Sequence, residues 1–597
     1  MSEYIAPLRD MQFVMKELAG LDQVLQLPGN EEVDADVVDA ILEEASKFAS
    51  NVLSPINFSG DQEGAHWADK AVTVPAGFKE AYLQFAENGW TALPCDPEYG
   101  GQGLPKLVAT AVNEMWKSSN MAFALCPMLT AGAIEALLTA GSDELKQKFL
   151  PKMVDGTWTG TMNLTEPNAG SDLAAVRSRA EPVGDGSYKV FGQKIFITYG
   201  DHNMTENVVH LVLARTPNAP EGVKGISLFV VPKFMVKDDG SLGERNDAYC
   251  VSIEHKLGIH GSPTAVMAFG DNGGAIGYLV GEENHGLEYM FVMMNAARFA
   301  VGLEGVAQCE RAYQRAAVYA KERIQGTELG VKGGPKVAII KHPDVRRMLM
   351  SMRSLTEATR TLAYVVAGAL DNAKSNPDAE ARAKAQAFAD LMIPVVKGWS
   401  TETGIQVAST GVQVHGGMGF IEETGAAQHL RDARITAIYE GTTGIQANDL
   451  IGRKMAREGG VTIKAVIAEM RALDAQLAAQ SGAEFAVLRS RLSSAVNALE
   501  EAVNWLLDNF KPNIKAAHAG AVPFLHLLGI VAGGWQLARG ALVAQAKIDA
   551  GESDPFYKGK IVTARFFADH LMVQAPALTQ SIVAGAEGSL TLEEDLF

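Results

Sequence analysis

Apolar residues recur at helical spacing along the first part of the chain. From Asp34 onward, Val37, Ile41, Ala45 and Phe48 fall on one stripe, and the aspartate is available as an N-cap. Several stretches of this kind predict an all-helical domain over residues 1–155.

Short runs rich in β-branched and aromatic residues replace this pattern over residues 156–285. Gly, Pro, Asn and Asp separate the runs, which is typical of β-strands packed as a sandwich or barrel. The predicted strands are 188–191, 194–198, 208–213 and 225–231.

Helical spacing returns at about residue 286 and continues, in a long segment, to near Arg323. Two more long helices are predicted over about 340–374 and 378–411, and a further helical stretch runs from Val461 to the mid-570s. The fold is therefore predicted to be mainly α with a central β domain. Its parts are a helical domain over 1–155, a β-sandwich or barrel over 156–285, a helical bundle over 286–459 and an additional C-terminal helical domain over 460–597.

Composition narrows the range of partners. The chain has 597 residues, which is too long for one hydrophobic core, and a formal net charge of −18. Such a surface repels nucleic acid and anionic membranes at long range, and nucleic acid is not expected as a partner. The four cysteines lie far apart without a Cys-x-x-Cys pair, so neither disulfides nor a metal site is expected, and a reducing cytoplasm is favoured.

No targeting or transmembrane segment is expected. Residues 1–7 include an acid and lack a continuous apolar stretch, unlike a signal peptide. In the apolar stretch 524–537, His526 and Gln536 break the run short of the roughly 20 residues that a membrane span needs. A buried helix is predicted there, with a helix on the membrane surface as the alternative.

Glu440 is the strongest candidate for chemistry. It lies between Tyr439 and Gly441 in the run 431–446. Aromatic and apolar neighbours remove a carboxylate from water, which raises its pKa and makes it a better proton acceptor near neutral pH. The glycine leaves room for a ligand to approach closely. Taken alone, such a glutamate also fits a turn or a helix cap; the surrounding motifs favour a base.

Seven motifs follow one another in order along the chain. They are PEYGGQGL (97–104), LTEPNAGSD (164–172), GQKIFIT (192–198), KLGIHGSPT (256–264), RIQ (323–325), QVHGGMG (413–419) and YEGT (439–442). In order and spacing this set resembles the acyl-CoA dehydrogenase family of FAD flavoproteins. The chain length, the start at 7–11 and the C-terminal extension are most similar to the 3-methylmercaptopropionyl-CoA dehydrogenase type, whose substrate belongs to dimethylsulfoniopropionate catabolism.

The resemblance implies the acyl-CoA dehydrogenase fold, in which a helical domain, a β domain and a four-helix bundle follow one another. It also implies FAD, because no side chain can accept the hydride that leaves the substrate. By the family pattern Glu440 is the catalytic base, and its backbone N–H stabilises the developing enolate oxygen.

Ten residues match family positions that contact FAD: Thr165, Ser171, Phe196, Thr198, Arg323, Gln325, Gln413, Gly416, Gly417 and Thr442. In the family, the pair matched by Arg323 and Gln325 reaches the FAD of a neighbouring subunit, so a homo-oligomer, dimer or tetramer, is expected. This chain departs from the common pattern at Phe196, where many members have Trp, and at Gly326, where most have Phe.

Three residues match substrate contacts: Ser171, Arg298 and Gly441. The expected reaction is α,β-dehydrogenation of an acyl-CoA thioester to a trans-2-enoyl-CoA, with electrons passed to an electron-transfer flavoprotein. The acyl group is expected to be 3-methylmercaptopropionyl or a straight chain of short or medium to long length, because one methylene changes discrimination by only about 1–3 kcal/mol.

Two other functions share the resemblance. An acyl-CoA oxidase, which passes electrons to O2, also has additional C-terminal helices. A DNA-associated flavoprotein of the same fold predicts a basic C-terminal domain, whereas the residues after 460 have mixed charge.

Overall fold

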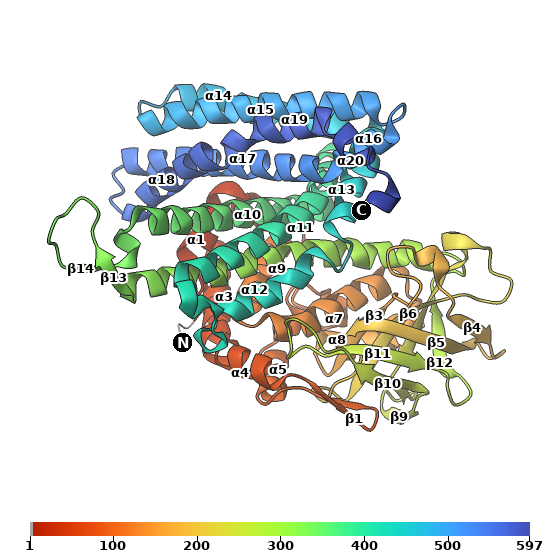
Figure 1. Ribbon diagram of the computed structural model, residues 1–597. Coiled ribbons are helices and arrows are strands. Elements are labelled where there is room, and N and C mark those ends of the chain that lie inside the picture. Colours follow the sequence, from red (N-terminus) through yellow and green to blue (C-terminus); the bar gives the residue numbers. More distant parts are fainter. Residues whose placement is uncertain (1–3) are drawn as a thin grey trace. The chain divides into compact units, whose positions relative to one another are not determined.

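The structure is a computed structural model that describes residues 4–597. It divides into two compact units that do not follow the order of the sequence. The helical unit comprises Met1–Ser46, Pro105–Ser118 and Val301–Phe597, and the sheet unit comprises Lys47–Leu104 and Ser119–Ala300. Along the chain, helices precede and follow a central run of strands, and further helices occupy the C-terminal part (Figure 1), which confirms the predicted fold class.

An eight-stranded sheet forms the centre of the sheet unit. Its order is β10-β11-β5-β12-β7-β6-β3, and β4 also pairs with β5, so the sheet curls around this one long strand. The described pairs in it are antiparallel except β3 with β6. The strands are β3 (Trp158–Asn163), β4 (Arg179–Pro182), β5 (Ser187–Thr198), β6 (Asn207–Ala214), β7 (Ser227–Pro232), β10 (Ala248–Ile253), β11 (Thr264–Phe269) and β12 (Ala275–Val280).

The sheet is buried on both faces. Leu211 and Leu228 join a core shared with α7 (Met121–Ala140) and α8 (Asp143–Val154). Val212 and Phe229, their neighbours in sequence, join a second core on the other face. Successive side chains of a strand point to opposite faces, so burial on both sides explains why β6 and β7 are almost continuously apolar.

Two of the predicted strands are in fact one. The runs 188–191 and 194–198 both belong to β5, which continues through Gly192 and Gln193. The glycine is not a turn residue here: a Cβ at Gly192 would lie 2.3 Å from the Ser178 Oγ. The absence of a side chain lets the segment that carries Ser178 pass close to β5.

The stripe predicted for α3 (Ala35–Phe48) is shifted by one residue. Val37 is 41% exposed, whereas Val38 and Leu42 are fully buried together with Ala45. The positions that begin at Val37 and those that begin at Val38 both fit the helical period, and the packing of the helix buries the second set. The predicted cap is present, because the Val37 N–H donates to Asp34 Oδ1 at 2.8 Å.

The first 155 residues are not all helical, because a hairpin of β1 (His66–Ala68) and β2 (Ala71–Thr73) interrupts them. Asp69 and Lys70 connect the strands, with φ of 48° and 63°. Two consecutive left-handed residues make the tight turn that suits a two-residue hairpin. In this region the sheet unit also holds α4 (Pro55–Glu63) and α5 (Phe78–Glu87).

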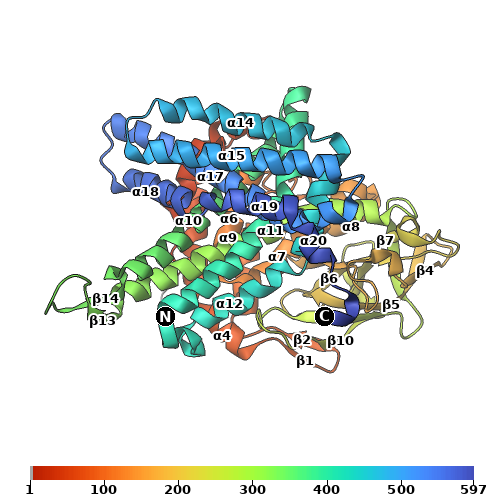
Figure 2. The same cartoon turned by 45° about the horizontal axis from the view of Figure 1, so that its top comes forward.

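Long helices form the helical unit. The first layer contains α6 (Lys106–Ser119), α9 (Gly286–Glu322), α10 (Pro343–Ser375) and α11 (Ala379–His415), with α1 (Leu8–Phe13), α2 (Leu21–Leu25), α12 (Ala426–Arg434) and α13 (Thr443–Asp449) beside them. The C-terminal helices lie over α10 and α11 as a second layer (Figures 1 and 2). They are α14 (Val461–Ala478), α15 (Ala483–Asn509), α16 (Ile514–Ala519), α17 (Ala521–Asp549), α18 (Pro555–His570), α19 (Ala575–Ala584) and α20 (Ala586–Leu590).

A second hairpin, of β13 (Ile324–Thr327) and β14 (Lys336–Ala338), was also not predicted. It projects beyond the ends of α9 and α10 (Figure 1).

Among residues 4–597, three helices are long and apolar enough to cross a membrane by length and composition: α7, α9 and α17. Within the fold, 67%, 67% and 83% of their most apolar windows are buried. Packing inside the protein therefore accounts for their apolar character, and for α17 it agrees with the buried helix predicted over 524–537.

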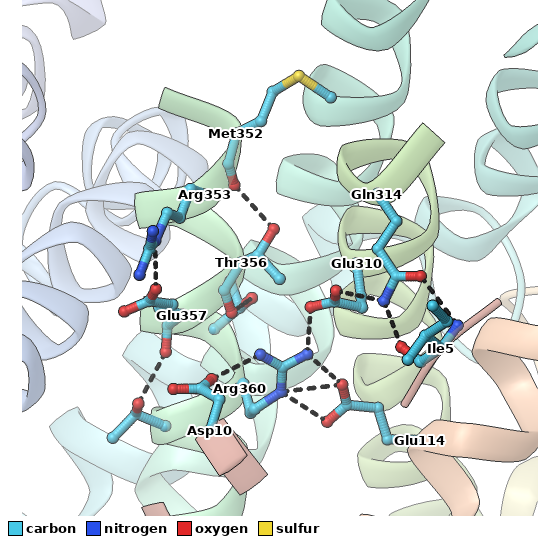
Figure 3. Close-up of polar contacts among 12 residues, drawn as sticks. Ile5, Asp10, Glu114, Glu310, Gln314, Met352, Arg353, Thr356, Glu357 and Arg360 are labelled. Carbon is cyan, nitrogen blue, oxygen red and sulfur yellow. Dashed lines mark hydrogen bonds and ion pairs between the residues drawn. The ribbon is translucent and has the colours of Figure 1, made fainter. Parts of the chain in front are cut away.

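Arg360 joins distant segments of the helical unit (Figure 3). This α10 residue is 1% exposed and donates to Asp10 at 2.7 Å, to Glu114 at 2.6 Å and to Glu310 at 2.6 Å. Lys560 of α18 pairs with Asp10 and, at 2.9 Å, with Glu357. Burial acts to raise the pKa of Asp10, but Lys560 and Arg360 outweigh it and lower that pKa to about 2.

We predict that Arg360→Met lowers the free energy of unfolding by about 3–5 kcal/mol, because it leaves three carboxylates buried without their shared cation. Urea unfolding followed by circular dichroism measures the change. The matched control is Arg347→Met on the same helix, whose exposed pair with Asp344 should contribute less than about 1 kcal/mol. A loss for Arg360→Met no larger than for this control would contradict the role of the network.

Candidate active site

The candidate residues fall in both units. The sheet unit contains Thr165, Ser171, Phe196, Thr198 and Arg298. The helical unit contains Arg323, Gln325, Gln413, Gly416, Gly417, Glu440, Gly441 and Thr442.

Phe196 stands at an irregularity of strand β5. Ile197 pairs with Ala265 and Lys194 with Met267, so Ile195 and Phe196 together oppose a single residue of β11. This is a β-bulge, a device that redirects a side chain and is frequent beside active sites. Phe196 takes φ of 59°, which a bulky residue rarely adopts, and the residue is 60% exposed.

The bulge frees a backbone group to hold Thr165. The Ile195 N–H leaves the sheet ladder and donates to the Thr165 carbonyl oxygen at 2.9 Å. Thr165 is thereby fixed beside Phe196, although the two are far apart in sequence. Thr198 follows two residues later and pairs with Thr264.

A buried ion pair fastens the loop that carries Thr165 and Ser171. Lys194 Nζ donates to Glu166 at 2.8 Å and to the Leu164 carbonyl oxygen at 3.0 Å. Glu166 also accepts from the N–H groups of Arg177 and Ser178, at 2.7 and 3.0 Å, so one carboxylate closes both ends of the loop. Burial lowers the pKa of Lys194 to about 8, while Glu166 opposes that shift. The exposed Ser171 lies within this loop.

Arg298 lies in α9 and is 5% exposed. The structure therefore places it within packed side chains and not on the outer surface of the sheet unit.

At the end of α11, the structure brings five candidates together. The rings of Tyr319 and His415 lie 4.4 Å apart, and the Arg323 N–H donates to the Tyr319 carbonyl oxygen at 2.8 Å. The end of α9, which leads into Arg323 and Gln325, therefore lies beside the end of α11, which carries Gln413 and leads into Gly416 and Gly417. A Cβ at either glycine would meet no atom within 4 Å, so the backbone there is open to a ligand.

Glu440 occupies a turn between a 3-10 helix (Ile435–Ala437) and α13. Its φ is 53° and that of Gly441 is 86°, and Glu440 is half-buried. Gln446 Nε2 donates to the Glu440 carbonyl oxygen at 3.1 Å, and Thr442 caps α13 by accepting from the Ile445 N–H at 3.3 Å. A strained glutamate persists only where its surroundings fix it, which is typical of functional sites.

The helical unit keeps this turn apart from the group at the end of α11. Lys397 of α11 donates to the Gly441 carbonyl oxygen at 2.7 Å, whereas Gln413 lies sixteen residues further along the same helix. At 1.5 Å per residue, the separation is roughly 24 Å. Within the helical unit, the predicted FAD residues thus form two groups, one beside the middle of α11 and one at its C-terminal end.

Sequence reasoning missed the residues that support the candidates. Glu166, Lys194 and Lys397 occur within or near the motifs, but their roles depend on burial and on partners up to 44 residues away. A lysine inside an apolar helical stretch, as at Lys397, was the only signal available.

The residues present fit a flavin dinucleotide. An exposed aromatic ring on a rigid strand, with Thr165 beside it, suits a flat ring system, and the open backbone at Gly416 and Gly417 suits phosphate. A carboxylate held on a strained turn suits proton transfer. A helical–β–helical fold with these features defines a flavin-dependent oxidoreductase.

Comparisons with known proteins agree. Four family models match consecutive segments: acyl-CoA dehydrogenase N-terminal domain over 36–157, middle domain over 161–271, C-terminal domain over 284–455, and acetyl-CoA dehydrogenase C-terminal like over 462–593. The chain belongs to the acyl-CoA dehydrogenase family. It is therefore an FAD-dependent oxidoreductase with acyl-CoA dehydrogenase activity.

Two curated relatives extend over nearly the whole chain. The chain is 50% identical to 3-methylmercaptopropionyl-CoA dehydrogenase of Ruegeria pomeroyi, over 98% of this chain and 99% of that protein. It is 34% identical to a butyryl-CoA dehydrogenase of Syntrophomonas wolfei, over 100% and 99%. A solved Bacillus anthracis acyl-CoA dehydrogenase complexed with FAD shares the fold, with a TM-score of 0.74, 20% identity, and 98% of this chain and 93% of that chain covered.

We predict that Lys194→Met weakens FAD binding about 10- to 100-fold. The change removes a charge-assisted hydrogen bond that fastens the Thr165 loop, and such bonds contribute about 1.5–3 kcal/mol. Fluorescence titration of the apoprotein with FAD measures the affinity. Lys233→Met, which removes another ion pair of the sheet unit with Asp201, is the control and should bind FAD normally. Equal affinity in both variants would refute the role of Lys194.

Proposed function

We propose that this enzyme oxidises 3-methylmercaptopropionyl-CoA to the corresponding trans-2-enoyl-CoA, and that it also accepts straight-chain acyl-CoAs of similar size. The supporting observation is the 50% identity to the Ruegeria pomeroyi enzyme from end to end, including the C-terminal helices. The butyryl-CoA relative supports a small acyl group of comparable length.

In the proposed reaction Glu440 removes the proton from Cα of the thioester, and its backbone N–H donates to the carbonyl oxygen as negative charge develops there. The turn serves both tasks because one residue presents the N–H and the carboxylate. Arg298, Ser171 and Gly441 are proposed to contact the substrate.

Thr165, Ser171, Phe196, Thr198 and Thr442 are proposed to hold the flavin end of FAD. When bound, FAD accepts the hydride that leaves Cβ, which completes the two-electron oxidation. We propose that an electron-transfer flavoprotein then removes both electrons from the enzyme.

We propose further that a second copy of the chain completes the site. Arg323, Gln325, Gln413, Gly416 and Gly417 lie roughly 24 Å along α11 from the Glu440 turn, so this group suits the FAD of a neighbour. Exposed apolar side chains surround it: Ile324, Met418, Phe420 and Ile421. The expected species in sedimentation equilibrium is a dimer or tetramer, and a monomer that retains full activity would contradict this proposal.

The first test is anaerobic mixing of the purified yellow protein with a panel of acyl-CoAs. The panel contains 3-methylmercaptopropionyl-CoA and straight chains from C4 to C16. We expect flavin absorbance near 450 nm to bleach fastest with 3-methylmercaptopropionyl-CoA and butyryl-CoA. Bleaching only by long chains would contradict the proposed substrate. Rapid reoxidation of the bleached flavin when O2 is afterwards admitted would favour an oxidase.

In the same experiment Glu440→Gln should retain FAD and bind acyl-CoA but bleach about 10²- to 10⁴-fold more slowly, because an amide does not accept the α-proton. Glu423→Gln, at an exposed glutamate of the same unit, is the control and should react normally. Near-normal bleaching by Glu440→Gln would show that the base lies elsewhere.

A further inference from the structure

A buried ionic cluster lies beneath the turn that carries Glu440. Glu304 of α9 is fully buried, and its carboxylate lies 3.5 Å from the ammonium of Lys117, which is 2% exposed. The Tyr439 hydroxyl donates to the other oxygen of Glu304. Because Tyr439 directly precedes Glu440, the cluster is attached to the turn itself.

The cluster is unusual for a protein interior. Burial raises the pKa of Glu304, while Lys117, Tyr439 and Lys397 oppose that shift, and burial lowers the pKa of Lys117. Apolar residues of similar volume often fill such a space with equal or greater stability. The charged groups therefore suggest a function other than stability.

A second attachment acts on the other side of Glu440. Lys397, which is fully buried, donates to the Gly441 carbonyl oxygen at 2.7 Å. Gln446 Nε2 donates to the carbonyl oxygen of Glu440 at 3.1 Å. The residues immediately before and after Glu440 are thus both tied to buried groups, and Glu440 lies between them at φ of 53°.

The left-handed conformation of Glu440 needs such support. A left-handed backbone conformation is unfavourable for a residue with a Cβ, and it persists only where surrounding contacts hold the backbone in place. The side-chain hydroxyl at 439 and the carbonyl at 441 are the points at which this support is applied.

We propose that Glu304, Tyr439 and Lys397 are positioning residues that hold Glu440 in the geometry needed to remove the α-proton. The proposal rests on the proposed function, in which Glu440 is the base. A base displaced by about 1 Å can lose roughly 10²-fold in rate, although the substrate still binds. The three residues act through the turn and need not touch the substrate.

Tyr439→Phe is the main test, because it removes one hydroxyl and keeps the ring. With 3-methylmercaptopropionyl-CoA we expect the rate of flavin reduction to fall about 10- to 100-fold, with KM and FAD content within twofold of the parent. The kinetic isotope effect from a substrate deuterated at Cα should increase, because proton removal becomes more rate-limiting.

The chain offers a matched control in Tyr364→Phe. Tyr364 is fully buried in the helical unit, whereas Tyr439 is partly buried, and like Tyr439 it donates to a buried glutamate, here Glu114 at 2.7 Å. Tyr364→Phe should leave the rate and the isotope effect within twofold of the parent. Equal losses of rate in the two variants would show a merely structural effect and overturn the proposal.

Lys397→Met provides an independent second variant, since it removes the donor to Gly441 without touching Tyr439. It should slow flavin reduction with the same unchanged KM, and a parental rate in both Tyr439→Phe and Lys397→Met would overturn the proposal. Rapid reaction of Glu440→Gln would refute the base assignment, whereas an inactive Glu440→Gln beside a fully active Tyr439→Phe would refute only the positioning role.

Discussion

The helical unit depends on the single guanidinium of Arg360. It contacts Asp10 near the N-terminus, Glu114 of α6 and Glu310 of α9. Asp10 also pairs with Lys560 of α18, which extends the network to the C-terminal helices. A planar group with five N–H donors can bind three carboxylates at once and still bind one of them, Glu114, through two of its nitrogens. Segments from residue 10 to residue 560 are thereby fixed in one arrangement, and the bundle gains a defined register that apolar packing alone specifies less strictly.

Buried charges also lie beside two of the candidate site residues. Phe196 and Glu440 both adopt left-handed φ angles that disfavour their side chains. A buried lysine lies beside each one. Lys194 pairs with Glu166 next to the bulge, and Lys397 holds the carbonyl after Glu440. Backbone strain and a buried charge are thus found side by side at both positions.

The order of domains and most long helices could be predicted from the sequence, because the spacing of apolar residues and the length of each such segment are visible in a single sequence. The sequence did not separate Val37 from Val38 on α3, since both fit the helical period and only packing distinguishes them. The β13–β14 hairpin and the continuity of β5 were also not predicted. In a sequence, a glycine in a hairpin turn cannot be distinguished from a glycine in a bulge or at a close contact. Among the candidate site residues, Glu440 and Phe196 lie in motifs that a single sequence displays. Glu304 carries no such local signal, because its partners Lys117 and Tyr439 are 187 and 135 residues away.

The C-terminal helices bear on the site through the same helix that carries Lys397. Gly529 and Gly533 of α17 face Trp399, and a Cβ on them would lie 2.3 and 2.6 Å from its ring atoms. Glycines at that spacing let α17 approach α11 closely, two residues from the lysine that holds Gly441. The C-terminal helices are therefore part of the core that packs against α11 and α13, on either side of the Glu440 turn. This packing accounts for the apolar character of α17, because 83% of its most apolar window is buried.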